Sequence, residues 1–216
     1  MNVNTAKMLA KAKPNIASLM RTRPYYTVPN MILQYKTHVL GLLELNIGVF
    51  YHACDTILET IANIQNSFVK KLDLFVEQAF LDHNLAPLCT RRDIAMLGLL
   101  YKCAHGQAHP ELCELFRRQE PMHCWQTRLQ SNRHNIQLVE DEDGTRHEFL
   151  RRSIFGLVRI WNRLDQTLVE APSCSKFQGA LTELVRNRCR ANSENWEKFF
   201  SPRTVLTSAH ERYYCQ

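Results

Sequence analysis

The sequence predicts a mostly α-helical fold, an irregular multi-helix bundle with one small β-hairpin near residues 136–150. Apolar residues recur at helical spacing through most of the chain. Only seven glycines and eight prolines occur in 216 residues, fewer than a sandwich or barrel with many tight turns requires. With 45% hydrophobic residues, the chain is long enough to bury one substantial core. We therefore expect one domain, or one domain with an appendage.

Three helices are expected in the first 72 residues. The first is short, with Pro14 in its first turn, where the missing N–H needs no partner, and it ends at Met20. The second opens after Thr27 and Pro29. The third has the clearest amphipathic pattern in the chain, and its apolar face consists of Cys54, Ile57, Leu58, Ile61, Ile64, Phe68 and Leu72.

Further helices and the hairpin are expected after residue 72. A short helix covers 76–83, and a buried one begins near Thr90, where Asp93 completes a capping box. Ser153 caps another helix, and a last long one contains residues 177–185. The Asp143-Gly144 pair is the hairpin's turn. The predicted organisation is a helical segment with a basic N-terminus (1–72), a helical region with the hairpin (73–190) and a loosely ordered tail (191–216).

Apolar run lengths and cysteine content predict an intracellular protein, nuclear or cytoplasmic. No apolar run approaches the roughly eighteen residues of a membrane span, and the first twenty residues lack the apolar core of a secretory signal. Eight cysteines in a chain of this size, without an export signal, are expected to be reduced thiols.

Positive charge is concentrated at the two ends of the chain. Residues 1–50 and 151–216 each carry a net charge of +5, whereas residues 51–150 carry −4. A basic surface built from both ends would attract a polyanion such as a nucleic acid. The alternative interpretation is an ordinary solvated surface with a basic bias.

Six cysteine and histidine residues, both metal-binding types, fall within 22 positions of the least periodic part of the chain: Cys103, His105, His109, Cys113, His123 and Cys124. They could supply a tetrahedral zinc site, and zinc would stabilise a segment that has little core of its own. Their spacing matches no common zinc finger or knuckle. Buried cysteines and surface histidines are the alternative.

The sequence contains no familiar catalytic constellation. It has no glycine-rich phosphate loop, no dinucleotide-binding fingerprint, no zinc-protease motif and no nucleophile elbow. The acidic cluster at 141–143 lies at the expected hairpin tip, where carboxylates are usually solvated. We therefore expect no catalytic residue and no cofactor.

Three blocks of sequence resemble the C-terminal part of non-LTR retrotransposon reverse transcriptases. "LMRTRPYYTVPNMILQYKTHVLGLLELNIGVFYHA" is similar to their thumb-side segment, and "LAPLCTRRDIAMLGLLYKCAHG" to the helix after the catalytic core. "FLRRSIFGLVRIWNRLDQTLVEAPSCSKFQGAL" resembles their closing segment, with Trp161, Asn162, Leu164, Val169, Ala171, Ser173, Phe177 and Leu181 in step. The resemblance covers roughly residues 14–184, and Asp165 stands where the family usually has proline.

The resemblance implies a non-catalytic fragment of an RNA-directed DNA polymerase. The aromatic-Ala-Asp-Asp motif that binds the catalytic metals is absent, because the chain contains no Asp-Asp pair, and the fingers and palm are missing. The implied partner is RNA or DNA, bound weakly and in a salt-dependent way. The surface that the palm would cover also implies self-association or binding of the missing polymerase domains. The implied phosphate contacts are Lys11, Lys13, Arg21, Arg23 and Lys36 from one end and Arg151, Arg152, Arg159 and Arg163 from the other.

Two other functions stay open at this point. One is an all-α protein-interaction module without enzymatic activity, and the other is a small zinc-stabilised module. Tyr25 and Tyr26 also have two interpretations, as base-stacking rings or as core residues beside a helix start.

Overall fold

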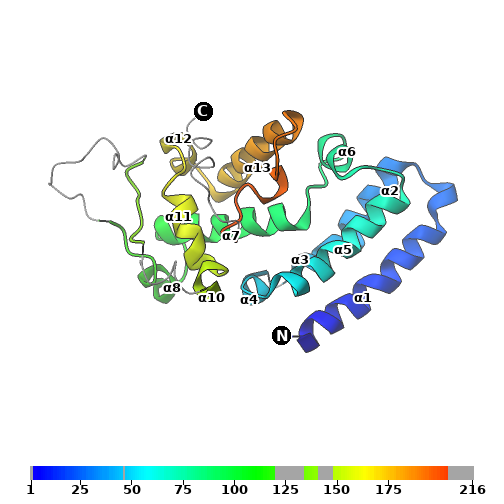
Figure 1. The fold of residues 1–216 in the computed structure, drawn as a ribbon, viewed down its shortest axis with the longest axis horizontal. Helices are drawn as coiled ribbons and strands as arrows, with labels where there is room; N and C mark the ends of the chain where they lie inside the picture. Colours follow the sequence, from blue (N-terminus) through cyan, green and yellow to red (C-terminus); the bar gives the residue numbers. More distant parts are fainter. Residues whose placement is uncertain (1, 46, 120–133, 141–147, 204–216) are drawn as a thin grey trace. The chain divides into compact units, whose positions relative to one another are not determined.

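The structure is a computed structural model that describes residues 2–45, 47–119, 134–140 and 148–203 (Figure 1). It divides into two compact units. Unit 1 comprises Met1–Arg92 and Arg186–Glu197, and unit 2 comprises Asp93–Val185 and Lys198–Gln216. Within the described ranges the regular elements are helices, which confirms the predicted mostly α class.

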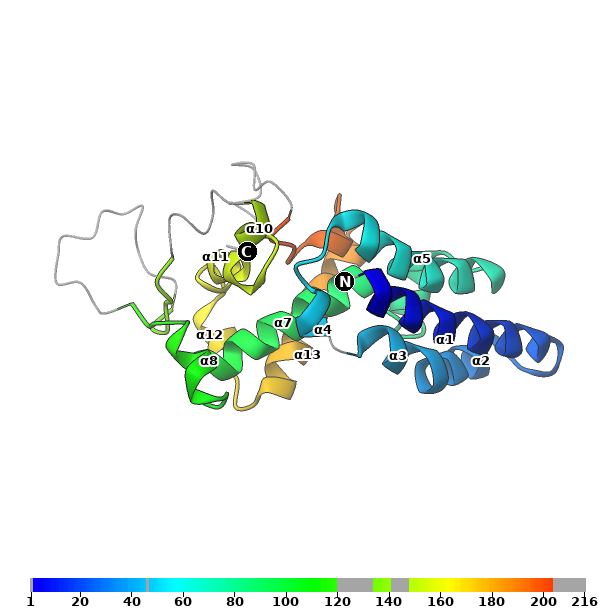
Figure 2. The ribbon, with the colours of Figure 1, turned by 90° about the horizontal axis from the view of Figure 1, so that it is seen from below.

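The first helix of unit 1 is much longer than predicted. Helix α1 covers Asn2–Arg21, so Pro14 lies inside it rather than in its first turn. The prediction failed because proline removes only one backbone donor, and the burial of one helix face offsets that loss. Ala12 and Ile16 are buried, and Met8, Leu9, Leu19 and Met20 pack against the same core. Helix α1 lies along α2 (Val28–Tyr35), α3 (Gly41–Glu44) and α5 (Asp55–Lys71), as Figures 1 and 2 show.

The second predicted helix is present, interrupted by a π-helical turn. A short 3-10 turn, η1 (Arg23–Tyr25), precedes α2, and the π turn η2 (Lys36–Leu40) joins α2 to α3. The extra residue of a π turn shifts the face of the helix that follows it. The buried residues before and after the turn are Met31, Ile32, Tyr35, Val39, Leu40 and Leu43.

Helix α5 confirms the clearest amphipathic prediction. It follows the short α4 (Ile47–Phe50) and buries Leu58, Ile61, Phe68 and Val69. Phe68 stacks on Tyr35 with ring centroids 4.3 Å apart. Apolar burial of this kind contributes about 25 cal/mol per Å². The core of unit 1 is thus centred on α2 and α5.

Residues 186–197 complete unit 1 beside α6 (Val76–Leu81). Trp196, in the 3-10 turn η4 (Trp196–Lys198), is buried and stacks on Phe80 at 5.5 Å. Arg186 donates to the side-chain oxygen of Asn84 at 2.7 Å and lies over the Phe80 ring. The described part of the predicted tail, up to Arg203, therefore includes a docked turn; residues 204–216 lie outside the described range.

The chain passes between the units at three points, one in α7 (Leu88–Ala104), one in α13 (Cys174–Arg190) and one in η4. Within unit 2, α7 and α13 pack against each other: Cys174 Sγ donates to the carbonyl of Gly98 at 3.4 Å. The predicted capping box is wrong, because α7 begins two residues before Thr90. The Thr90 hydroxyl instead donates to the carbonyl of Glu197 at 2.6 Å, a contact within unit 1.

An aromatic cluster forms the core of unit 2. Tyr101 of α7 stacks on Phe177 of α13 at 4.9 Å and meets Trp161 edge-on at 6.4 Å. Trp161 ends α11 (Val158–Trp161), which follows the 3-10 turn η3 (Ile154–Leu157). As predicted, Ser153 caps this segment by accepting from the Phe155 N–H. Among its described residues, unit 2 also contains the helices α8 (Pro110–Glu114), α10 (Glu148–Arg151) and α12 (Gln166–Val169).

The predicted β-hairpin is wrong. Its second half begins a helix, α10, and the first half forms only an isolated antiparallel bridge between Leu138 and Arg118. The turn residues 143–144 lie outside the described range. The alternating pattern predicted pairing with residues after the turn. Instead, the backbone of 136–139 forms hydrogen bonds with residues 117–119 and with the side chains of Trp161 and Asn162. In the described part of the chain, no helix is long and apolar enough to cross a membrane.

Candidate nucleic-acid interface

Helix α1 carries a concentrated and unopposed positive charge. Its twenty residues include four cations, Lys7, Lys11, Lys13 and Arg21, and no Asp or Glu. All four side chains are exposed. None of them takes part in the ion pairs recorded among the described residues. Three of these cations, Lys11, Lys13 and Arg21, were predicted to contact phosphates, and the fold leaves them accessible.

The other two residues of the first predicted set have structural partners. Arg23 donates to the Asp73 carboxylate at 2.6 Å. Asp73 adopts a left-handed conformation (φ 58°) directly after α5, so the ion pair joins η1 to the end of that helix. Lys36 donates to the carbonyl of His83 at 2.7 Å, and burial, followed by the charge of Arg91, lowers its pKa. Lys36 is therefore better explained as a packing residue than as a phosphate contact.

The second predicted set lies in unit 2, around α10 and α11. Arg151, Arg152, Arg159 and Arg163 are each only partly exposed. A guanidinium nitrogen of Arg151, of Arg152 and of Arg163 is shielded from solvent. The carbonyl of Arg152 also accepts a hydrogen bond from Arg203 at 3.3 Å. Because the two predicted sets belong to different units, each is considered as a separate surface.

Two tyrosines next to α1 are exposed rather than buried in the core. Tyr25 is 84% exposed and Tyr26 is 47% exposed. They follow Arg21 and Arg23 in the sequence, so two cations and two aromatic rings lie within six residues. Bases stack on such rings with little regard to sequence. The base-stacking interpretation of these two residues remains available.

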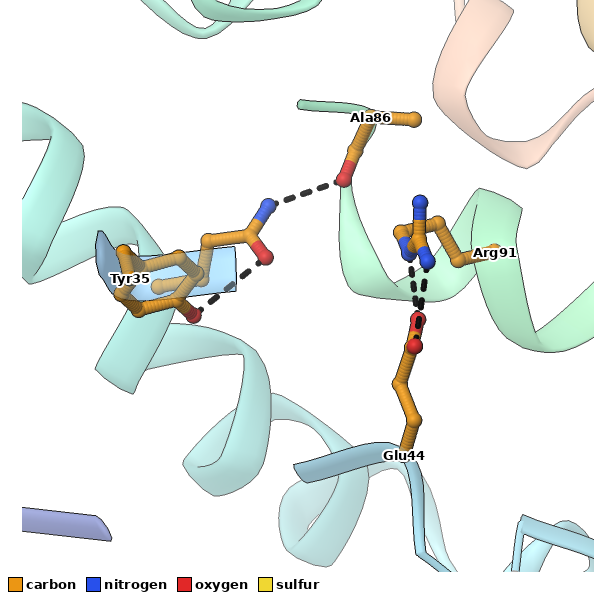
Figure 3. Close-up of polar contacts among 5 residues, drawn as sticks. Tyr35, Glu44, Ala86 and Arg91 are labelled. Atoms are coloured by element: carbon orange, nitrogen blue, oxygen red, sulfur yellow. Dashed lines mark hydrogen bonds and ion pairs between the residues drawn. The ribbon is translucent and has the colours of Figure 1, made fainter. Parts of the chain in front are cut away.

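The most buried polar network of unit 1 is structural (Figure 3). Gln65 is only 2% exposed; its amide nitrogen donates to the carbonyl of Ala86 at 2.9 Å, and its oxygen accepts from the Tyr35 hydroxyl at 3.4 Å. Beside it, Arg91 donates to both carboxylate oxygens of Glu44. Burial, then the Glu44 charge, raises the Tyr35 pKa. With their partners inside the fold, these groups fix α5 and α3 to the start of α7.

Two grooves flank α1. The α1–α5 groove has a volume of about 420 Å³ and is lined by Leu9, Lys13, Ile16, Ala17, Thr60, Asn63, Ile64, Ser67 and Lys71. The α1–α2 groove is smaller, about 280 Å³, and is lined by Asn15, Ser18, Leu19, Thr22, Tyr26, Gln34 and His38. Lys71 was not among the predicted phosphate contacts, because the sequence around it does not indicate that α5 will place it in the same groove as Lys13.

The predicted zinc ligands are only partly brought together. The Cys103 thiol is buried and lies beside Cys113; burial, then Cys113, raises its pKa to about 11. His105 instead hydrogen-bonds the carbonyl of Tyr101 at 2.9 Å, and His109 is exposed beside Glu111. The described residues contain no group of three or more ligands suited to a metal. His123 and Cys124 lie outside the described ranges, as does the acidic cluster at 141–143.

The Trp161–Asn162 pair, which carries much of the sequence resemblance, has a structural role. Trp161 Nε1 donates to the carbonyl of Ile136 at 2.8 Å. Asn162 donates to the carbonyl of Leu138 at 2.8 Å and accepts from the Leu138 N–H at 2.9 Å. His134, missed by the sequence reasoning, is 3% exposed and hydrogen-bonds the carbonyl of Trp161 at 2.9 Å. These contacts dock residues 134–140 onto α11.

Comparison with known protein families, with curated proteins and with solved structures finds no match to this chain.

Proposed function

We propose that the chain is a non-catalytic nucleic-acid-binding protein, similar to the C-terminal part of a non-LTR retrotransposon reverse transcriptase. The observation that carries the binding proposal is the charge of α1, four exposed cations with no acidic residue on the same helix. Closely spaced cations without carboxylate partners attract phosphates and release the counterions that surround them. The exposed Tyr25 and Tyr26 add rings on which bases can stack.

The proposed role excludes polymerisation by this chain alone. Template-directed phosphoryl transfer requires paired carboxylates that hold two metal ions. The chain has no Asp-Asp pair at any position. The resemblance of the three sequence blocks supports a part of the enzyme that lies beside template and primer rather than the part that does the chemistry.

The test is fluorescence anisotropy with a labelled RNA–DNA duplex across a salt series. The variant Lys7→Gln, Lys11→Gln, Arg21→Gln removes three exposed α1 cations. It is expected to reduce the slope of log affinity against log salt by about 2.7, because each lost phosphate contact removes about 0.9. The matched control, Lys102→Gln, Lys176→Gln, Lys198→Gln, removes three exposed cations elsewhere and should bind as the wild type does. If the wild type does not bind, or both variants lose affinity equally, the proposal is wrong.

A protein-interaction module is the second candidate, and exposed apolar side chains of unit 1 favour it. Leu33, Leu45, Val49 and Phe75 are each more than half exposed. Exposed apolar side chains of this kind can mark a surface that another protein covers. A concentration-dependent molar mass in light scattering, abolished by Leu45→Ser with Val49→Ser, would favour this alternative. A mass equal to one chain at all concentrations would count against self-association.

A further inference from the structure

The α1–α5 groove combines cations, neutral donors and an apolar floor. On α5, Thr60, Asn63, Ser67 and Lys71 face it, spaced as one side of a helix. Lys13 faces it from α1, and Leu9, Ile16 and Ile64 supply apolar surface. No Asp or Glu lines the groove. A surface with two ammonium groups and no carboxylate selects for an anion.

The polar groups of the groove remain available to a ligand. Neither Lys13 nor Lys71 forms one of the ion pairs recorded among the described residues. Because the Thr60 hydroxyl donates to the carbonyl of Thr56 at 2.7 Å, the donors open to a ligand are those of the two lysines, Asn63 and Ser67. Both lysines and the Asn63 and Ser67 side chains are exposed. A ligand with several oxygen acceptors would therefore find donors already positioned by the two helices.

The shape of the groove favours an extended ligand. The lining residues on α5 run from Thr60 to Lys71, which corresponds to about 16 Å at the rise of an α-helix. The axes of neighbouring packed helices are only about 8–10 Å apart, so the groove over their seam is too narrow for a duplex and suits a single strand. The apolar side chains of the groove, Leu9, Ile16 and Ile64, suit the sugars and base faces of a strand whose phosphates contact the lysines.

We propose that the α1–α5 groove binds one strand of RNA or DNA, with Lys13 and Lys71 contacting backbone phosphates. This inference rests on the proposed nucleic-acid binding and assigns it to a defined surface. A lipid membrane fits less well, because none of the large exposed apolar side chains lines this groove. Lys71 and the neutral donors of α5 are new members of the interface, brought to α1 by the fold.

The first experiment compares two pairs of lysines by anisotropy with a labelled 15-nucleotide oligothymidylate. The groove variant is Lys13→Gln with Lys71→Gln. The control is Lys70→Gln with Lys102→Gln; Lys70 neighbours Lys71 on α5 but does not line the groove. The groove variant should lose affinity roughly tenfold to thirtyfold at 0.1 M salt, and its salt slope should fall by about 1.4. The control should change less than about twofold, because exposed charges outside the contact are screened.

A second variant tests the groove without changing charge. Ser67→Leu places a bulky aliphatic side chain, which offers no ring for base stacking, on the exposed side of α5 that faces the groove. It should weaken oligothymidylate binding as much as the lysine pair does, while circular dichroism and the thermal midpoint stay at wild-type values. A labelled polyglutamate of equal length should bind more weakly than the oligonucleotide, since it lacks bases and sugars for the floor.

Each other result overturns the inference. If the wild type binds but the groove variant matches it, or the control loses equally, the strand does not occupy this groove although nucleic-acid binding stands. If polyglutamate binds as tightly and is equally sensitive to Lys13 and Lys71, the groove takes an acidic peptide. If the wild type binds neither the oligonucleotide nor the RNA–DNA duplex, the proposed function fails together with the groove.

Discussion

Asn162 holds the backbone of Leu138 through both polar atoms of its side chain. The amide nitrogen donates to the Leu138 carbonyl at 2.8 Å, and the amide oxygen accepts from the Leu138 N–H at 2.9 Å. This two-point contact is what a β-strand partner would otherwise supply. It explains how residues 136–140 stay ordered in an extended form with only one bridge, to Arg118.

Replacing Asn162 by Asp is therefore expected to destabilise unit 2. The carboxylate cannot donate to the Leu138 carbonyl, and it would place two acceptors face to face. We expect a loss of about 1–3 kcal/mol in the free energy of unfolding, measured by urea denaturation. Asn66→Asp, at an exposed position on α5, is the control and should cost much less. Equal losses in the two variants would contradict the structural role of Asn162.

The buried side chain of His134 is expected to make the free energy of unfolding depend on pH. Its Nδ1 accepts from the Ile136 N–H at 3.2 Å, so the proton of the neutral ring is on Nε2, facing the Trp161 carbonyl at 2.9 Å. Burial lowers the His134 pKa below its ordinary value of 6.5, against a smaller raising effect of the Trp161 carbonyl. Below pH 6.5 the unfolded chain then binds more protons than the folded chain. The His134 contribution to stability is complete above pH 6.5 and is lost as the pH falls towards the folded pKa.

The measurement is urea denaturation of the wild type and His134→Gln between pH 7.5 and 5. The variant should be less stable at pH 7.5, and the difference from the wild type should shrink as the pH falls through 6.5. The effects of other titrating groups cancel in this difference. His38→Gln, at an exposed position of η2, is the matched control for the loss of one imidazole. A difference that stays constant or widens at low pH would show that His134 is not buried in its neutral form.

Periodicity within a segment predicted the helices that have a continuous apolar face. It failed where residues far away in the sequence determine the structure of a segment. The face of α5 was read correctly because Leu58, Ile61 and Phe68 repeat at helical spacing. The buried Gln65 on the same face was missed, since its partners Tyr35 and Ala86 are far away in the sequence. The hairpin failed for the same reason: the alternation near residue 138 was real, but its partner is the side chain of Asn162.

The candidate interface was predicted only in part, for a related reason. Charge counting together with the family resemblance pointed to Lys11, Lys13 and Arg21, because residues 1–50 contain six cations and one acidic residue. It could not tell that Arg23 would meet Asp73, nor that Lys36 would meet the carbonyl of His83. Ion pairs and grooves depend on which helices become neighbours, and one sequence without its fold does not specify that.

The described cysteines should differ widely in reactivity. Burial raises the pKa of Cys103 to about 11 and also raises that of Cys189, whereas Cys54 is exposed at the start of α5. At pH 8, roughly one in a thousand Cys103 thiols would be ionised, and only the thiolate reacts. Iodoacetamide labelling followed by peptide mass spectrometry should therefore modify Cys54 first, and Cys103 and Cys189 only after denaturation.

The same experiment examines the zinc hypothesis. Cys103 and Cys113 lie beside each other, but the described residues bring no group of three or more metal ligands together. We expect substoichiometric zinc in the purified protein by elemental mass spectrometry, and the same labelling pattern with and without a chelator. One zinc per chain, together with faster labelling of Cys113 after chelation, would establish a metal site that includes residues outside the described ranges.

Two glycines in unit 2 are expected to respond oppositely to alanine. A Cβ added at Gly156, in η3, would lie 2.8 Å from the carbonyl carbon of Arg151. Backbone atoms cannot move aside as a flexible side chain would. Gly156→Ala should destabilise by about 1–3 kcal/mol, the usual range for overpacking.

Gly179 is exposed on α13 with no atom within 4 Å of the added Cβ. Gly179→Ala should stabilise by about 0.5–1 kcal/mol, because alanine loses less backbone entropy in a helix. Thermal unfolding of the two variants beside the wild type gives the signs directly, and a Gly156→Ala midpoint at or above the wild-type value would mean that η3 is not held against Arg151.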